Sequence, residues 1–402
     1  MSPGVFNFSR LDPIEDSFFR ISRWILGLLQ CWPLDRLNRI TKIKLVLHLT
    51  ILLTAALGEI RSSWLLRKSL LEAIDALSPG VTKLVTWIKL VCFLIYRKDL
   101  ELILNSLLEH CKTDTKDSRK NYLIRKISYF NNMCCSVLYI NAITTSVSFG
   151  FKPIVVWAYQ YFVNEKRNTW VDLPYKAALP YEDMTEMNKP MYSFMYCFLA
   201  YSGLVTTFAV SGTDGTFLCF CMYISVAYQC LQEDFKSTFR VHAANDPKRS
   251  KILYNDLSAL IRRQQKIIEI FNSFNRVYTF MIFIHFVSAS ILLALLSINL
   301  LLASGVFKTI YLLYVLGITN HLFACCFGAE SVNKNCLKLS EVVYFCDWYN
   351  CDRKVKKLIL FALVKLQKGS PMKAPFFSPS LQLFASIIQT TISYFTILQT
   401  VL

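Results

Sequence analysis

Seven apolar stretches along the chain have the length of membrane-spanning helices. They cover roughly residues 43–58, 81–96, 127–149, 191–210, 277–303, 306–329 and 381–402. An α-helix rises about 1.5 Å per residue, so stretches of this length approach the ~30 Å hydrocarbon core of a bilayer. Hydrophobic residues make up 54% of the chain and charged residues only 18%. The pattern predicts an all-α, multi-pass membrane protein with seven transmembrane helices.

Lysine and arginine gather in every second segment between these stretches. Seven, eight, nine and nine of them lie in segments 1–44, 97–126, 231–276 and 331–380. Only three, five and one lie in segments 59–80, 150–190 and 304–308. Because short basic loops stay in the cytoplasm, we expect a cytoplasmic N-terminus and an extracellular C-terminus, the reverse of a G-protein-coupled receptor.

The same distribution explains the net charge of +17 without a nucleic-acid partner. A basic cytoplasmic face would instead favour anionic membrane lipids. Two cations do not fit this scheme, because Lys83 and Lys89 lie inside the second apolar stretch.

The fourth stretch continues into a mostly apolar run, residues 191–230, interrupted only by the Ser-Gly-Thr-Asp-Gly-Thr segment at 211–216. Two spans joined by a turn would place basic segments outside the cell, so we favour one long helix that extends to about residue 235. Asp214 would then lie near the cytoplasmic boundary. We favour an interhelical hydrogen-bonding role for it over a direct functional role.

Two segments outside the spans show helical patterns of apolar residues among charges. We expect segments 231–276 and 331–368 to form a cytoplasmic helical layer, whose charged surface is either a solvated face or a packed subunit interface. On the other side, segment 150–190 is long for a passive connection, so it is either a lid over a cavity or a disordered loop.

The chain carries no recognisable catalytic or metal-binding motif. Glycine-rich phosphate loops, HExxH and GxSxG are missing from the sequence, and the cysteines and histidines lack zinc spacing. We therefore expect no enzyme, cofactor or metal. His48, His285 and His321 lie on apolar faces and are expected to be hydrogen-bonded core residues. The halves of the chain show no internal symmetry of the kind found in many transporters, although a transporter stays an alternative.

Aromatic and small polar residues gather toward the predicted outer halves of several spans. Such residues, converging between helices, suit a small apolar ligand with one polar group, although each alone is also ordinary packing. The candidate ligand-binding residues are Trp87, Tyr139, Thr144, Thr145, Ser148, Phe149, Met195, Leu199, Ser202, Tyr311 and Tyr314.

The last span is polar but uncharged. Its polar residues include Gln382, Gln389, Thr390, Thr391, Ser393, Tyr394, Thr396, Gln399 and Thr400. Exposure of so many to lipid is costly, so they should face protein or water. Hydroxyls and amides beside an apolar constriction that contains Ile397 and Val401 suit a cation path. One helix cannot enclose a pore, so this interpretation implies an oligomer.

The C-terminal third carries a specific order of short motifs. Phe-Gly-Ala-Glu at 327–330 is followed by Cys-Asp-Trp-Tyr at 346–349 and by a basic stretch from Arg353. The last span then closes with Ser-Tyr-Phe-Thr-Ile-Leu at 393–398. This order, together with the inverted seven-span topology, resembles the insect odorant receptor family. The Thr-Tyr…Gln-Phe ending typical of gustatory receptors is missing.

The resemblance implies a subunit of a ligand-gated, non-selective cation channel in the plasma membrane of sensory neurons. It implies a heterotetramer with a shared co-receptor, a small volatile odorant as ligand, and a gate at Ile397 and Thr400. The family's co-receptor has glutamine at the position of Thr400 and a longer insertion after the fourth span, so this chain resembles an odorant-binding tuning subunit. A gustatory-type channel, a G-protein-coupled receptor and a transporter are the alternatives.

Overall fold

The computed structural model describes residues 18–162, 172–179, 188–241, 247–303 and 305–401. Within these residues the fold is helical. The first half comprises α2 (Arg20–Leu28), α3 (Arg39–Leu65), α4 (Leu70–Ile95), α5 (Arg97–Asp114) and α6 (Ser118–Phe162). The second half comprises α7 (Lys189–Val241), α8 (Pro247–Leu302), α9 (Val306–Tyr344), the short 3₁₀ turn η2 (Trp348–Asn350), α10 (Arg353–Leu366) and α11 (Leu381–Val401).

Seven of the described helices are long and apolar enough to cross a membrane: α3, α4, α6, α7, α8, α9 and α11. Each predicted span falls on one of them, and the all-α, seven-helix architecture is confirmed. Several helices run far past the apolar stretch, because α6, α7 and α8 comprise 45, 53 and 56 residues.

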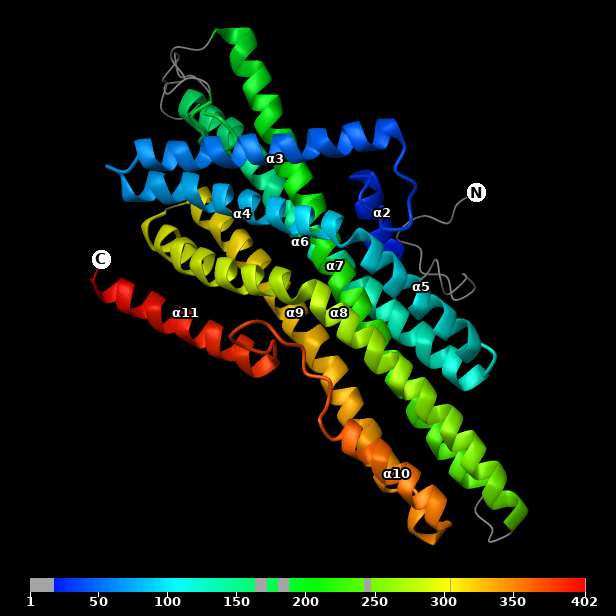
Figure 1. The fold of residues 1–402 in the computed structure, drawn as a ribbon. Helices are drawn as coiled ribbons and strands as arrows, with labels where there is room; N and C mark the ends of the chain where they lie inside the picture. Colours follow the sequence, from blue (N-terminus) through cyan, green and yellow to red (C-terminus); the bar gives the residue numbers. More distant parts are fainter. Residues whose placement is uncertain (1–17, 163–171, 180–187, 242–246, 304, 402) are drawn as a thin grey trace.

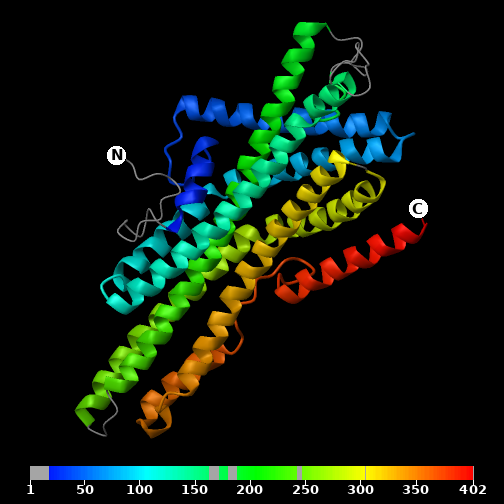
Figure 2. The same ribbon diagram turned by 180° about the vertical axis from the view of Figure 1, so that it is seen from behind.

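The helices form a bundle with two parts (Figure 1). The hairpin of α3 and α4 crosses the long helices α6, α7, α8 and α9 at one end of the molecule. At the other end, α5 and α10 pack on the extended portions of the long helices. Figure 2 shows the same arrangement from behind, with α11 at the margin of the bundle. Helix α11 packs against α8 and α9 through its first turns, where Leu383, Phe384 and Ile387 reach the main core.

Helix α7 is continuous through residues 211–216, in agreement with the one-helix interpretation. Glycine weakens an isolated helix by about 1 kcal/mol relative to alanine, so its presence here needs a tertiary reason. A Cβ atom on Gly212 would lie 2.6 Å from Cδ2 of Leu26, and one on Gly215 would lie 2.9 Å from Oγ of Ser22. The two glycines therefore let α2 pack closely against α7, and the buried side chains of α2 compensate for their low helix propensity.

The extended ends of α7 and α8 are held to α5 and α6 by a cluster of ion pairs. Arg263 of α8 bonds the carboxylates of Asp114 and Asp234, and Nη1 of Arg263 lies 2.7 Å from Oδ2 of Asp234. Lys120 at the start of α6 pairs with the same two carboxylates. The cluster fixes four helices at the end of the bundle where the sequence predicts the cytoplasmic layer.

Candidate functional site

A cavity of about 140 Å³ lies between α4, α6, α7, α8 and α9. An engineered apolar cavity of about 150 Å³ holds benzene, so this one has room for a molecule with about one ring. Four of the helices line it with the spacing i, i+3, i+4 and i+7, which places residues on one helix face. These positions are 142, 145, 146 and 149 in α6; 203, 206, 207 and 210 in α7; 285, 288, 289 and 292 in α8; and 314, 317, 318 and 321 in α9.

Threonine hydroxyls are numerous on the wall, but most are already used. Thr86 donates to the carbonyl of Thr82 at 2.6 Å, and Thr145 donates to that of Asn141 at 2.9 Å. Thr206 and Thr207 bond carbonyls one turn earlier in α7 in the same way. Because these hydroxyl protons are bonded within their own helices, the wall offers a ligand mainly methyl groups, aromatic faces and acceptor lone pairs.

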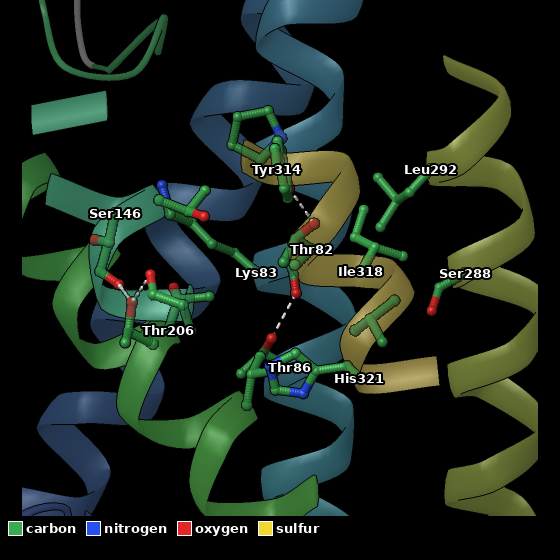
Figure 3. A pocket seen from close by; sticks show the side chains of 18 of the residues that line it. Thr82, Lys83, Thr86, Ser146, Thr206, Ser288, Leu292, Tyr314, Ile318 and His321 are labelled. Carbon is green, nitrogen blue, oxygen red and sulfur yellow. Dashed lines mark hydrogen bonds between the residues drawn. The ribbon is translucent and has the colours of Figure 1, made fainter. Parts of the chain in front are cut away.

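One end of the cavity, which we call the Tyr314 end, is closed by aromatic rings. The hydroxyl of Tyr314 hydrogen-bonds Thr82 Oγ1 (Figure 3). It also donates to the carbonyl of Ser78 at 3.2 Å. Phe149 stacks on Tyr175 with a centroid distance of 5.4 Å, and its ring meets that of Tyr314 edge-on. The described segment 172–179 therefore contributes a wall residue, Tyr175, to the cavity. Of the two interpretations of segment 150–190, this contact favours the lid for residues 172–179.

Beside this end lies a fully buried ion pair between α3 and α4. Lys83 bonds Glu59, and both side chains are almost completely buried. Nζ of Lys83 also lies 3.7 Å from the centroid of the Tyr175 ring. Inside a low-dielectric bundle, neither charge is tolerable alone, so the pair and the aromatic face must form together.

The opposite end, which we call the His321 end, contains a second charged cluster that joins four helices. Nζ of Lys89 lies 2.8 Å from Oδ1 of Asp214 and 2.9 Å from Nδ1 of His285. Oδ2 of Asp214 lies 3.0 Å from Nδ1 of His321. Asp214 is thus an interhelical hydrogen-bonding partner, as the sequence favours. The two cations inside the second apolar stretch are each paired with a carboxylate from another helix.

The structure places three of the eleven predicted ligand-binding residues on the cavity wall: Thr145, Phe149 and Tyr314. Met195, Leu199 and Tyr311 lie directly behind, in one buried apolar cluster with Phe149, Tyr175 and Tyr314. The hydroxyl of Tyr311 donates to Oδ1 of Asp75 at 2.7 Å instead of facing the cavity.

The other five residues lie outside the cavity lining. Trp87 and Tyr139 are half-buried against the larger hydrophobic core, and Tyr139 stacks on Phe208. Thr144 is exposed and Ser148 half-exposed on α6, and both donate to carbonyls of their own helix. Ser202 is buried and donates to the carbonyl of Leu199 at 2.7 Å.

Sequence reasoning missed most of the α4 and α8 contribution to the cavity. Lys83 and Lys89 were visible as ionisable residues in an apolar span, which is a functional signal by default. His285 and His321 were assigned to the core, and they do bond through Nδ1, but both also line the cavity. The spacing 285, 288, 289 and 292 in α8 was readable as one helix face, but the sequence does not say which face meets the cavity.

Helix α11, where the predicted gate residues lie, has a different environment. None of its described side chains is buried within this chain, and Ile397 is 61% exposed. Thr400 is also exposed and bonds only the carbonyl of Ile397 among the described residues. Val401 is the last residue of α11. The helix therefore presents both a polar and an apolar surface beyond its first turns.

Comparison with known proteins places the chain among chemosensory receptors. The model of the 7tm Odorant receptor family matches residues 69–392. Odorant receptor 22c of Drosophila melanogaster is 28% identical, with 97% of this chain and 98% of the relative covered. Odorant receptor 10a of the same species is 26% identical, with 97% of each chain covered. The odorant receptor coreceptor of Ooceraea biroi is 24% identical, but only 42% of this chain and 38% of the relative are covered.

Solved structures show the same fold. The insect olfactory receptor OR5 from Machilis hrabei matches with a TM-score of 0.81 at 19% identity, covering 95% of this chain and 97% of that chain. The same receptor in complex with eugenol matches with a TM-score of 0.79 at 19% identity, covering 96% and 100%. The arrangement of the helices around the cavity is therefore shared with a receptor of known structure.

Proposed function

Because the chain belongs to the insect odorant receptor family, whose members are receptors and not enzymes, we propose that it is the odorant-binding subunit of a ligand-gated, non-selective cation channel. The observation that carries the proposal is the cavity of about 140 Å³ between five helices, walled mainly by apolar groups with a few polar atoms. Such a site suits a small volatile molecule.

We assign direct ligand contact to Thr145, Phe149 and Tyr314, which line the cavity. Met195, Leu199 and Tyr311 act behind them, because they pack against the aromatic rings and hold their positions. A ligand of different shape at the Tyr314 end would therefore displace side chains of α7 and α9 as well as of α4.

The pore is proposed to run along α11, with Ile397, Thr400 and Val401 at its narrow part. The support is the unburied surface of this helix within one chain, together with its polar but uncharged composition. In lipid, a polar helix face needs protein or water as its neighbour. Copies of α11 from several subunits around one axis would supply that neighbour and enclose a water-filled path.

Assembly is proposed as a heterotetramer with the family's co-receptor. Helix α10 buries one face against its own chain, but Leu360, Phe361 and Val364 remain 49–59% exposed on the other. An apolar patch of this kind outside the apolar spans suits a subunit contact. The match to odorant receptors over nearly the full chain, against less than half for the coreceptor, supports a tuning role.

The topology is proposed from the distribution of positive charge. The described residues of the basic segments 97–126, 231–276 and 331–368 lie toward the end of the bundle that holds α5, α10 and the ion-pair cluster, which would face the cytoplasm of the sensory neuron. The C-terminal end of α11 would then reach the outer face of the plasma membrane. Epitope tags at the two ends, stained before and after permeabilisation, check this, and a surface-labelled N-terminus contradicts it.

Co-expression with the co-receptor in a heterologous cell tests the proposed function. We expect a panel of volatile compounds to evoke a non-selective cation current within a second, in excised patches without nucleotide triphosphates. A response abolished by blocking G-protein signalling would indicate a metabotropic receptor. Uptake of a labelled compound without conductance would indicate a transporter.

A further inference from the structure

The His321 end of the cavity holds two buried ring nitrogens without a hydrogen-bond partner among the described residues. They are Nε2 of His285 and Nε2 of His321. The two side chains are 9% and 5% exposed, and both line the cavity. Buried polar atoms in proteins are paired in the great majority of cases, so two unpaired nitrogens at one end of a cavity indicate a place for a polar group.

The partners of His285 decide which hydrogen-bonding role its free nitrogen has. Nδ1 of His285 lies 2.9 Å from Nζ of Lys89, and an ammonium group can only donate. Nδ1 must therefore be the acceptor, and the ring proton resides on Nε2. Nε2 of His285 is consequently a hydrogen-bond donor.

The partner of His321 imposes the opposite role. Nδ1 of His321 lies 3.0 Å from Oδ2 of Asp214, and a carboxylate can only accept. Nδ1 therefore carries the proton. Because the charge of Asp214 is already balanced by Lys89, which lies 2.8 Å from the other carboxylate oxygen, the neutral form of His321 suffices. In that form Nε2 of His321 is an acceptor.

The Lys89–Asp214 pair thus prepares two unlike groups, one donor and one acceptor, at the same end of the cavity. A hydroxyl group has the matching pair of functions, because its oxygen accepts and its proton donates. We infer that the cavity takes single-ring-sized alcohols or phenols, with the hydroxyl at the His321 end and the apolar body toward Tyr314. The Tyr314 and His321 ends lie on opposite sides of the lining residues drawn in Figure 3.

Other common classes of volatile molecule fit this end less well. An aldehyde, ketone or ether can accept from His285 but leaves His321 unpaired, and a hydrocarbon leaves both unpaired. An amine in its charged form would meet Lys89. A bound water also satisfies both nitrogens, and a ligand hydroxyl is the organic group that replaces such a water without loss of hydrogen bonds.

This inference rests on the proposed function, and the test separates the two. Currents from the co-expressed channel are recorded with benzyl alcohol, benzaldehyde and toluene, within a wider panel of volatile compounds. We expect benzyl alcohol to act at a concentration about tenfold below that of benzaldehyde, which corresponds to one additional hydrogen bond, and toluene to be weaker still.

Two variants sharpen the test. His321→Phe removes the acceptor, so the ratio between the alcohol and the aldehyde should fall to about one. Ser288→Ala is the matched control, because this hydroxyl lines the same cavity but already donates to the carbonyl of His285 at 3.0 Å, so the ratio should persist. The ratio is measured within each variant, and differences in expression therefore cancel.

The wild-type protein decides the matter even if His321→Phe fails to reach the surface. Benzaldehyde or toluene acting at concentrations equal to or below that of benzyl alcohol would overturn the hydroxyl preference and leave the channel function standing. A tenfold ratio retained in His321→Phe would overturn the role of His321 as the hydrogen-bond acceptor and leave the channel function standing. If no compound of the wider panel evokes current, the proposed function itself fails, and the inference fails with it.

Discussion

Helices α4 and α11 have the same mean hydropathy, 1.4 over their most apolar windows, yet they lie in opposite environments. Half of that window is buried in α4, and none of it is buried in α11. Helix α4 contains two lysines, each paired with a carboxylate from another helix. Helix α11 contains no charge, and among the described residues the hydroxyls of Thr390, Thr391, Thr396 and Thr400 donate to carbonyls of α11 itself and not to another helix.

The difference shows that polar groups in an apolar helix have two separate uses. In α4 they are satisfied inside the chain, where they fix neighbouring helices and shape the ends of the cavity. In α11 they are left for water or another subunit. The predictions below test this division, from the largest expected effect to the smallest.

The Glu59–Lys83 pair should be essential to the fold. Glu59→Leu leaves the ammonium of Lys83 buried without a counter-charge, and removal of one partner of such a pair costs about 3–5 kcal/mol. Thermal unfolding of the purified protein should show the loss, and Glu59→Leu combined with Lys83→Met should recover most of it. Glu72→Gln is the control, because its pair with Lys176 is far more exposed and should change stability by less than about 1 kcal/mol. Equal stability of Glu59→Leu and Glu72→Gln would refute the argument.

Tyr314→Ala should change ligand sensitivity and leave the pore intact. The side chain of Tyr314 is 9% exposed and forms part of the cavity wall. Its removal deprives a bound ligand of apolar contact, which should raise the effective ligand concentration roughly ten- to hundredfold. Dose–response curves measure the change, and bi-ionic reversal potentials measure the pore. Tyr161→Ala, at an exposed position near the end of α6, should alter neither. A shift in reversal potential for Tyr314→Ala would contradict the division.

Phe361→Gln should weaken assembly without unfolding the chain. The side chain is 55% exposed on α10, so its loss removes a candidate subunit contact but no part of the core. We expect roughly a tenfold drop in co-purification with the co-receptor. Lys357→Gln, an exposed change one turn earlier on α10, is the control. Unchanged co-purification of the phenylalanine variant would remove α10 from the interface.

Ile397→Ala and Thr400→Ala should have the reverse effect of Tyr314→Ala. Both residues are exposed on α11, and we expect altered leak or ion selectivity with an unchanged rank order of ligands. The changes should be a few-fold at most, because the co-receptor contributes the other copies of the pore helix. Ile392→Ala is the control for Ile397→Ala, since Ile392 lies about 140° away from Ile397 around the helix. A new ligand ranking in the Ile397 or Thr400 variants would count against the pore assignment.

A pH effect should be confined to the ion-pair cluster outside the apolar spans. Burial raises the pKa of the Asp114 carboxyl, but hydrogen bonds from His110 and Arg263 and the charges of Arg263 and Lys120 outweigh burial and hold the pKa below its ordinary value. A lowered pKa stabilises the fold above the unfolded-state pKa of about 3.9, and this stabilisation is lost as the pH falls through the folded-state value. Unfolding of Asp114→Asn should therefore differ most from wild type near pH 7, and the gap should shrink below about pH 4. A difference in stability between the two proteins that widens in acid would contradict the lowered pKa of Asp114.

The candidate site was only partly predictable. Thr145, Phe149 and Tyr314 were found because aromatic and hydroxyl residues at these positions stand out in apolar spans. Trp87 and Tyr139 have the same appearance in sequence, but they face the larger core, because hydropathy does not specify the rotation of a helix about its axis. The histidines at 285 and 321 were recognised as buried, but not the orientation of their free nitrogens.

The amino-acid pattern by itself determined the seven candidate membrane spans, the single long course of α7 and the family resemblance, because these depend on local properties: apolar length, charge between the spans and the order of short motifs. The tertiary structure alone decided which helix faces meet. It paired Lys83 with Glu59, 24 residues away, and Lys89 with Asp214, 125 residues away. It also showed that Gly212 and Gly215 make room for α2, and that His285 and His321 present unlike nitrogens to one cavity. Such pairings arise from packing between helices that are distant in the chain, where a buried charge or polar atom must find its partner in three dimensions.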